Sequence, residues 1–131
     1  MTILDEINAN KFKEIELVKA KVSIDELQSS ALFDRKCISF RDAILNKSGI
    51  IAEFKRKSPS KGTINGDAIP SDVAVGYQDA GVSAISCLTD KDYFGGTFHD
   101  LKSIRSAVEL PILRKDFMLD EYQLFEAKSI G

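Results

Sequence analysis

Two residues of opposite charge stand at the end of an apolar run, in the stretch Ile50–Gly62, "IIAEFKRKSPSKG". Side chains along an extended strand alternate between its two faces, so Glu53 and Lys55 are expected to point the same way. A lysine that is partly removed from water and close to other cations loses its proton more easily, which suits proton transfer. The pair is therefore either a plain ion pair at a solvated rim or a functional pair. In the functional case Lys55 attracts an anionic substrate, and Glu53 orients lysines and substrate groups.

A second lysine ends a later apolar run. Lys115 follows Pro111-Ile112-Leu113-Arg114 and precedes Asp116. Its plain interpretation is a lysine paired with Asp116 or Glu53, and its functional interpretation is a third ionisable group that acts together with Glu53 and Lys55. The spacing within each run leaves both interpretations open.

Two loops add polar and aromatic side chains. The segment 58–62 is basic and rich in hydroxyls, as phosphate-binding or closing loops are, although its composition favours a mobile connector. It does not contain the G-x-x-x-x-G-K-[ST] pattern of a P-loop. The charged segment 89–96 carries Phe94 before two glycines, and Phe94 either lines an apolar substrate pocket or plugs the top of the fold.

The elements that must position these residues alternate along the chain. We expect strands at 49–54, 84–88 and 111–115, each followed by a helix, at 71–80, 98–108 and 120–129. Such alternation predicts parallel strands with right-handed crossovers, and the continuous apolar runs fit strands covered on both faces. In parallel α/β folds the working groups lie at the carboxyl ends of the strands, where Glu53, Lys55 and Lys115 are expected.

A helical segment precedes this alternation. Apolar residues recur at helical spacing through residues 1–47, and Ser23 with Glu26 has the form of a capping box that starts a second helix carrying Leu27, Ala31 and Leu32. A third, short helix is expected at 39–45. The predicted organisation is an N-terminal helical extension at 1–47 followed by β/α units at 48–131.

Composition excludes several classes of function. The formal net charge of −2 lacks the basic footprint of a general nucleic-acid-binding protein. Apolar runs are too short for a membrane span, and the N-terminus lacks a signal-peptide core, which indicates a cytoplasmic protein. Cys37 and Cys87 are expected as reduced thiols rather than disulfide or metal ligands, and the single histidine, His99, cannot anchor a histidine-rich metal site.

Three segments together resemble one known family. "IIAEFKRKSPSKG", "AISCLTDKDYFGGTFHDL" and "PILRKDFMLDEYQL" are similar, in order and spacing, to successive signatures of indole-3-glycerol phosphate synthase, and the helical preamble resembles that family's N-terminal extension. The resemblance implies a TIM (β/α)8 barrel with extra N-terminal helices. It also implies a lyase of tryptophan biosynthesis that needs no cofactor or metal. Its phosphorylated small-molecule substrate, 1-(2-carboxyphenylamino)-1-deoxyribulose 5-phosphate, undergoes indole ring closure with loss of CO2 and water.

The resemblance also implies roles for five residues. Lys115 matches the general acid at the ribulose carbonyl, and Lys55 the cation that holds the substrate carboxylate or phosphate and assists later proton transfer. Glu53 matches the carboxylate that positions the lysines and the substrate. Ser58 matches a loop serine near the substrate, and Phe94 matches the aromatic residue against the anthranilate ring.

The chain departs from the family in length. A closed barrel takes about 250 residues, and its phosphate site usually follows strands seven and eight. We expect the 131 residues to form only the first three β/α units of a truncated barrel. We expect this chain alone to be inactive or nearly so, and to form a homo-oligomer, most simply a dimer, through its exposed barrel edges.

Two other functions are compatible with parts of this sequence. Phosphoribosylanthranilate isomerase is a barrel of the same pathway, but it relies on a strand-end Cys and Asp pair, whereas Cys87 falls inside the second predicted strand. A non-catalytic part-barrel fragment that acts as a folding or self-assembly module is the alternative from a different class. Restored turnover on adding a C-terminal partner fragment would distinguish the lyase from this module.

Overall fold

The computed structural model describes every residue from 1 to 131, and the chain divides into two compact units. One unit is built from Met1–Lys36 and Phe117–Gly131, and the other from Cys37–Asp116. The predicted boundary between the N-terminal extension and the β/α units, at residues 47 and 48, is a different kind of division from these compact units, and it stays a prediction. No helix in the chain combines the length and apolarity that crossing a membrane requires.

The unit Cys37–Asp116 contains a parallel sheet of three strands in the order β1-β4-β5. Its strands are β1 (Ile51–Phe54), β4 (Ala84–Leu88) and β5 (Ile112–Lys115). The central strand β4 is buried along its whole length, as its mostly apolar sequence predicted. The parallel β/α alternation of the sequence analysis is therefore confirmed, with strand ends within two residues of those predicted.

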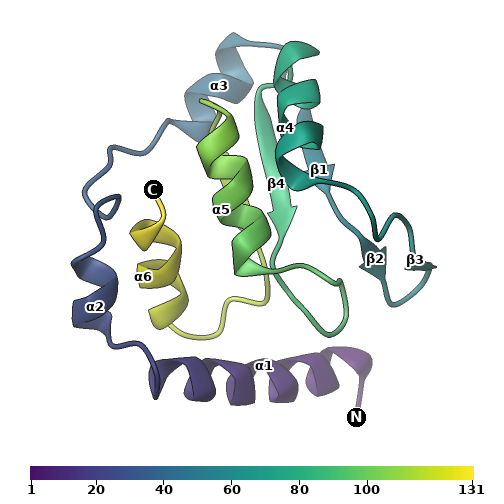
Figure 1. The fold of residues 1–131 in the computed structure, drawn as a ribbon. Helices are drawn as coiled ribbons and strands as arrows, with labels where there is room; N and C mark the ends of the chain where they lie inside the picture. Colours follow the sequence, from purple (N-terminus) through teal and green to yellow (C-terminus); the bar gives the residue numbers. More distant parts are fainter. The chain divides into compact units, whose positions relative to one another are not determined.

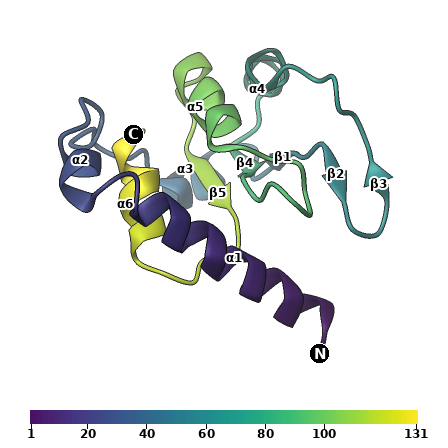
Figure 2. The same cartoon turned by 60° about the horizontal axis from the view of Figure 1, so that its bottom comes forward.

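Helices cover this sheet. They are α3 (Phe40–Asn46), α4 (Pro70–Asp79) and α5 (Phe98–Ala107). The helices α4 and α5 pack against each other and lie side by side over the sheet in Figures 1 and 2. The core between these layers includes Ile85 and Ile104, both fully buried. Since β1, β4 and β5 run parallel to one another, the carboxyl ends of all three strands reach one rim.

A short antiparallel hairpin, which the sequence analysis did not predict, follows β1. Its strands are β2 (Lys57–Ser58) and β3 (Gly62–Thr63), paired Lys57 with Thr63 and Ser58 with Gly62. Gly62 has φ +64°, a backbone conformation that favours glycine. The segment expected to be a mobile connector is therefore an ordered hairpin in the structure.

The other unit is helical, with α1 (Ile3–Lys19), α2 (Ile24–Gln28) and α6 (Tyr122–Ser129). Ser23 caps α2 as predicted, because its hydroxyl accepts a hydrogen bond from the backbone N–H of Glu26. The helix ends at Gln28, so the prediction that it carries Ala31 and Leu32 is wrong. Ser29 bonds its hydroxyl back to the Glu26 carbonyl, and such local bonds compete with helix continuation.

Candidate active site

The Glu53 carboxylate lies between the two predicted strand-end lysines. Its Oε1 is 3.5 Å from Nζ of Lys55, and its Oε2 is 3.4 Å from Nζ of Lys115. The hydroxyl of Ser86 donates a hydrogen bond of 3.0 Å to the same Oε2. Two cations and one hydroxyl therefore share a single carboxylate at the rim of the sheet.

Strand register explains how residues from separate segments meet. Glu53 on β1 stands beside Ser86 on β4, and Leu88 on β4 stands beside Lys115 on β5. The side chains of Glu53 and Lys55 are about one-third exposed and that of Lys115 about half exposed. A cluster with two cations and one anion, open to solvent, can bind an anionic ligand while its ammonium groups donate protons.

Arg56 holds the segment that follows β1. Its guanidinium donates from Nε (3.2 Å) and Nη2 (3.0 Å) to the two oxygens of the buried Asp100 carboxylate at the start of α5. Nη1 also donates to the backbone carbonyls of Gly66 and Ala68. Bidentate pairing of this kind fixes geometry as well as charge. The backbone next to Lys55 is thereby tied to both the following loop and α5.

Ser58, a predicted substrate-binding residue, is buried within the hairpin. Its hydroxyl accepts a hydrogen bond of 3.2 Å from the backbone N–H of Lys61 and lies 3.4 Å from the Ser60 hydroxyl. The structure therefore places Ser58 beside the hairpin turn. Along the chain it follows Lys55 by three residues.

Phe94, the other predicted substrate-binding residue, is half buried in the loop that follows β4. Its neighbour Gly95 has φ +67°, and a Cβ there would come within 3.1 Å of the Lys57 side chain. A Cβ on Gly96 would lie 2.1 Å from the Leu88 carbonyl oxygen, so only glycine fits. The loop that carries Phe94 is thus packed closely against the carboxyl end of β4 and against the base of the hairpin.

A separate network fixes the end of β5. The Thr89 hydroxyl donates to Asp116 (2.6 Å) and accepts from Nε of Arg114 (3.2 Å). The Asp116 side chain is almost fully buried, at 2% exposed. Of the two partners that the plain interpretation offered Lys115, the structure shows Glu53 at ion-pair distance. Asp116 instead joins the loop after β4 to the residue that follows Lys115.

Cys87 does not have the properties of a nucleophile. Its side chain is fully buried, and this burial, together with the nearby Asp100 charge, raises the pKa of its thiol to about 12. A thiol with such a pKa stays protonated at neutral pH. This geometry does not provide the strand-end cysteine that the isomerase alternative requires. No group of three or more His, Cys, Asp or Glu side chains in the chain is arranged to hold a metal ion.

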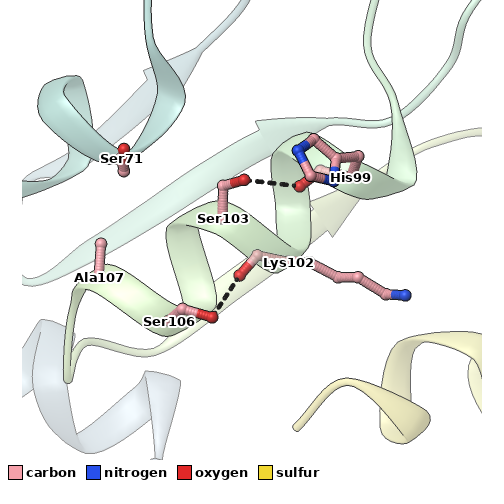
Figure 3. A pocket seen from close by; sticks show the side chains of 6 residues that line it. All are labelled: Ser71, His99, Lys102, Ser103, Ser106 and Ala107. Atoms are coloured by element: carbon pink, nitrogen blue, oxygen red, sulfur yellow. Dashed lines mark hydrogen bonds between the residues drawn. The ribbon is translucent and has the colours of Figure 1, made fainter.

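A shallow hollow of about 440 Å³ lies elsewhere in this unit, between Ser71 of α4 and one side of α5 (Figure 3). The hydroxyls of Ser103 and Ser106 donate to the backbone carbonyls of His99 and Lys102 in the same helix. Figure 3 shows the Lys102 side chain extending away from Ser71. None of the five predicted site residues lines this hollow, and its polar groups do not converge.

Sequence reasoning missed the residues that support the cluster, namely Ser86, Arg56, Asp100 and Thr89. A polar residue inside an apolar strand was a visible signal for Ser86. Its partner could not be identified, because single-strand patterns do not give the register between strands. Arg56 directly follows Lys55 in the sequence, but nothing local connects it with Asp100.

A parallel β/α sheet with a lysine–carboxylate–lysine cluster at its strand ends belongs to the class of α/β proteins that place their chemistry at the carboxyl rim. The family model for "Indole-3-glycerol phosphate synthase" matches residues 4–131, and the chain belongs to this family, whose fold is a TIM barrel.

Named relatives agree with the family match. A protein of Bacteroides thetaiotaomicron named indole-3-glycerol phosphate synthase is 48% identical over 130 residues, which cover 98% of this chain and 50% of the relative. One of Neisseria meningitidis with the same name is 42% identical over 134 residues, covering 98% of this chain and 52% of the relative. The chain therefore spans about half the length of the curated relatives it matches.

Proposed function

We propose that this chain supplies the N-terminal part of an indole-3-glycerol phosphate synthase, with the first three β/α units of its barrel. The reaction closes the indole ring of 1-(2-carboxyphenylamino)-1-deoxyribulose 5-phosphate and releases CO2 and water. The observation that carries the proposal is the Glu53 carboxylate shared between Lys55 and Lys115 at the strand ends. Family membership and the names of the relatives support the same reaction.

Lys115 acts as the general acid in this proposal. Its ammonium group donates a proton to the ribulose carbonyl oxygen, and the carbonyl carbon becomes electrophilic for attack by the aromatic ring. Its half-exposed side chain can reach a substrate above the rim. A positioned acid of this kind contributes roughly 10²- to 10⁴-fold to a rate.

Lys55 and Glu53 serve the substrate and the later steps. Lys55 holds the substrate carboxylate or phosphate, and its charge favours binding of an anionic molecule at the rim. Glu53 positions both lysines and the substrate amine or hydroxyls. Loss of CO2 restores the aromatic benzene ring. The loss of water that follows needs an acid to protonate the leaving hydroxyl and a base to take a proton from the new ring, and a lysine beside a carboxylate suits that step.

Ser58 and Phe94 bind substrate in this proposal. Phe94 contacts the anthranilate ring from the loop after β4, and Ser58 contacts the substrate from the hairpin. The close packing of Gly95 against Lys57 supports the proposal, because it brings these two loops together. An apolar seat for the ring also favours decarboxylation, since loss of charge is easier away from water.

The test is formation of indole-3-glycerol phosphate, followed by indole fluorescence. Three samples are compared: this chain alone, this chain with the half of the Bacteroides relative that it does not match, and that half alone. We expect turnover only in the mixture, and its loss in Lys115→Ala. The matched control Lys102→Ala removes an exposed lysine from α5 and should keep turnover. A folded, associated mixture without turnover contradicts the proposal, as does an active Lys115→Ala.

We also propose that residues 1–131 alone turn over little or no substrate, because barrels of this type usually bind phosphate after strands seven and eight. A second candidate function, a self-assembling part-barrel module, is favoured by the two edge strands, whose residues Ile51 and Leu113 are 48% and 45% exposed. Sedimentation at tens of micromolar should then show a dimer. A monomer at that concentration contradicts the module.

A further inference from the structure

Ser86 is a buried hydroxyl on the central strand, directly beneath the shared carboxylate. It is 3% exposed, and its Oγ donates to Oε2 of Glu53 at 3.0 Å. It stands beside Glu53 in the β1–β4 register, so its backbone is fixed by the sheet on both sides. Among the three groups that contact this carboxylate, Ser86 is the one that carries no charge.

The position of Ser86 matters because Glu53 and Lys115 lie on strands that are not neighbours. Strands in a sheet are about 4.8 Å apart, so β1 and β5 are separated by roughly 9.6 Å across β4. Glu53 must lean over β4 for its Oε2 to come within 3.4 Å of Lys115. Lys55, by contrast, is two residues from Glu53 in the same segment. Without a third contact, the carboxylate would relax toward Lys55.

The contact with Ser86 is also the tightest of the three. The two lysine contacts measure 3.4 and 3.5 Å and come from flexible, solvent-exposed side chains. Exposed ion pairs are individually weak, whereas a hydrogen bond from a buried donor to a carboxylate is strong and directional. The serine side chain has a single rotatable carbon–carbon bond, so little conformational freedom is lost in holding this geometry.

We propose that Ser86 is a positioning residue: its hydroxyl holds the Glu53 carboxylate over the central strand so that Lys115, as well as Lys55, stays within reach of it. The role in catalysis rests on the proposed function, since it assigns Lys115 as the acid. The placement of the Glu53 carboxylate does not depend on the proposed function, because it follows from the geometry of this chain alone. If Ser86 bonded to Glu53 only to satisfy its own buried hydroxyl, replacing Ser86 would leave the contacts of Lys55 and Lys115 with Glu53 unchanged.

Competitive lysine labelling tests the placement without turnover. Limiting acetic anhydride is added to this chain, and acetylation of Lys55 and Lys115 is measured by mass spectrometry of the peptides. In Ser86→Ala we expect labelling of Lys115 to rise about 1.5- to 5-fold relative to Lys55, the range for losing one exposed ion pair. Ser86→Cys, nearly isosteric but a weak donor, should shift the ratio the same way if the alanine variant fails to fold.

The matched control is Ser83→Ala. Ser83 is also buried and lies directly before the start of β4. Its hydroxyl accepts a hydrogen bond of 2.8 Å from the backbone N–H of Gly49, not from a group of the candidate site. It should leave the labelling ratio unchanged. An unchanged ratio in Ser86→Ala or Ser86→Cys overturns the proposal, and so does an equal shift in Ser83→Ala.

The catalytic part is tested in the reconstituted mixture described above. Ser86→Ala should lower kcat by roughly tenfold with little change in KM, the loss expected for one hydrogen bond to a charged group. Ser86→Thr keeps the hydroxyl and should recover most of this loss. If the wild-type mixture is inactive, the proposed function fails and the labelling result still stands. If the mixture is active and Ser86→Ala matches the wild type in kcat, the catalytic role of Ser86 is overturned.

Discussion

The two units of the chain join distant segments of sequence in different ways. In Cys37–Asp116, strands pair through a continuous backbone ladder, and the central strand is fully buried. In the helical unit, individual side chains bond to backbone carbonyls about a hundred residues away along the chain. These bonds run from Tyr122 to Val22, from Ser30 to Ser129, from Arg35 to Gly131 and from Lys128 to Arg35.

The two ways of joining segments position side chains with different precision. A β-ladder fixes the positions of many side chains at once, because every residue in a strand shares its register. Separate polar contacts fix only the residues that make them. The candidate site lies wholly in the sheet-containing unit, which agrees with this distinction. Variants in the two units should therefore affect turnover and stability in different proportions.

Removing the shared carboxylate should give the largest effect. We expect Glu53→Gln to lower turnover in the reconstituted mixture by at least about a hundredfold, because both lysines lose the group that positions them. The free energy of unfolding, measured in urea, should change by less than about 1 kcal/mol, since the side chain is one-third exposed. The control Glu6→Gln in α1 should change neither quantity. Equal turnover in Glu53→Gln and Glu6→Gln would contradict the placement of the chemistry in the sheet-containing unit.

Breaking the Arg56–Asp100 pair should give the largest loss of stability. Asp100→Asn leaves the guanidinium without its bidentate partner in a largely buried position. We expect a loss of about 2–3 kcal/mol in the free energy of unfolding. Urea denaturation measures it, with Asp79→Asn at the exposed end of α4 as the control. A loss no greater than that of the control would show that this pair does not stabilise the unit.

A single contact in the helical unit should matter less. The buried Tyr122 hydroxyl donates a hydrogen bond of 2.7 Å to the Val22 carbonyl. Tyr122→Phe should cost about 1 kcal/mol, the usual value of one such bond. Hydrogen exchange of α6 amides would localise the loss, and turnover in the mixture should stay within about twofold of the wild type. A large loss of turnover would mean that the helical unit contributes directly to the chemistry.

The smallest effect should come from acid. Lys19 donates a hydrogen bond of 2.6 Å to Asp120, and this bond lowers the pKa of the Asp120 carboxyl from its ordinary 3.8. A lowered pKa in the folded state means that the contribution to stability is present above the ordinary value and is lost as the pH falls through the folded value. The helical unit should therefore lose a little stability as the pH falls below the ordinary value of 3.8. Urea denaturation at several acidic pH values measures this loss, and Asp120→Asn should remove it. An unchanged dependence of the free energy of unfolding on pH in Asp120→Asn would contradict this prediction.

Much of this molecule was predictable from local patterns. The strand at 84–88 was predicted at its observed bounds, and α4, α5 and α6 within two residues of theirs. Apolar runs and capping residues act over a few neighbours, so one segment contains the information. The hairpin after β1 was missed because its strands are two residues each, too short for a period-two pattern. Helix α2 was predicted too long because apolar spacing continued past Ser29.

The amino-acid sequence alone was enough to predict the order of the elements and the chemical types at the strand ends, including Glu53, Lys55 and Lys115. It also carried the family signatures that the comparisons bear out. Only the tertiary structure decided that both lysines share one carboxylate, that Ser86 holds it, and that Asp116 joins Thr89. The physical reason is that each of these contacts depends on the register between strands or on loop packing, and both arise only when segments far apart in the chain come together.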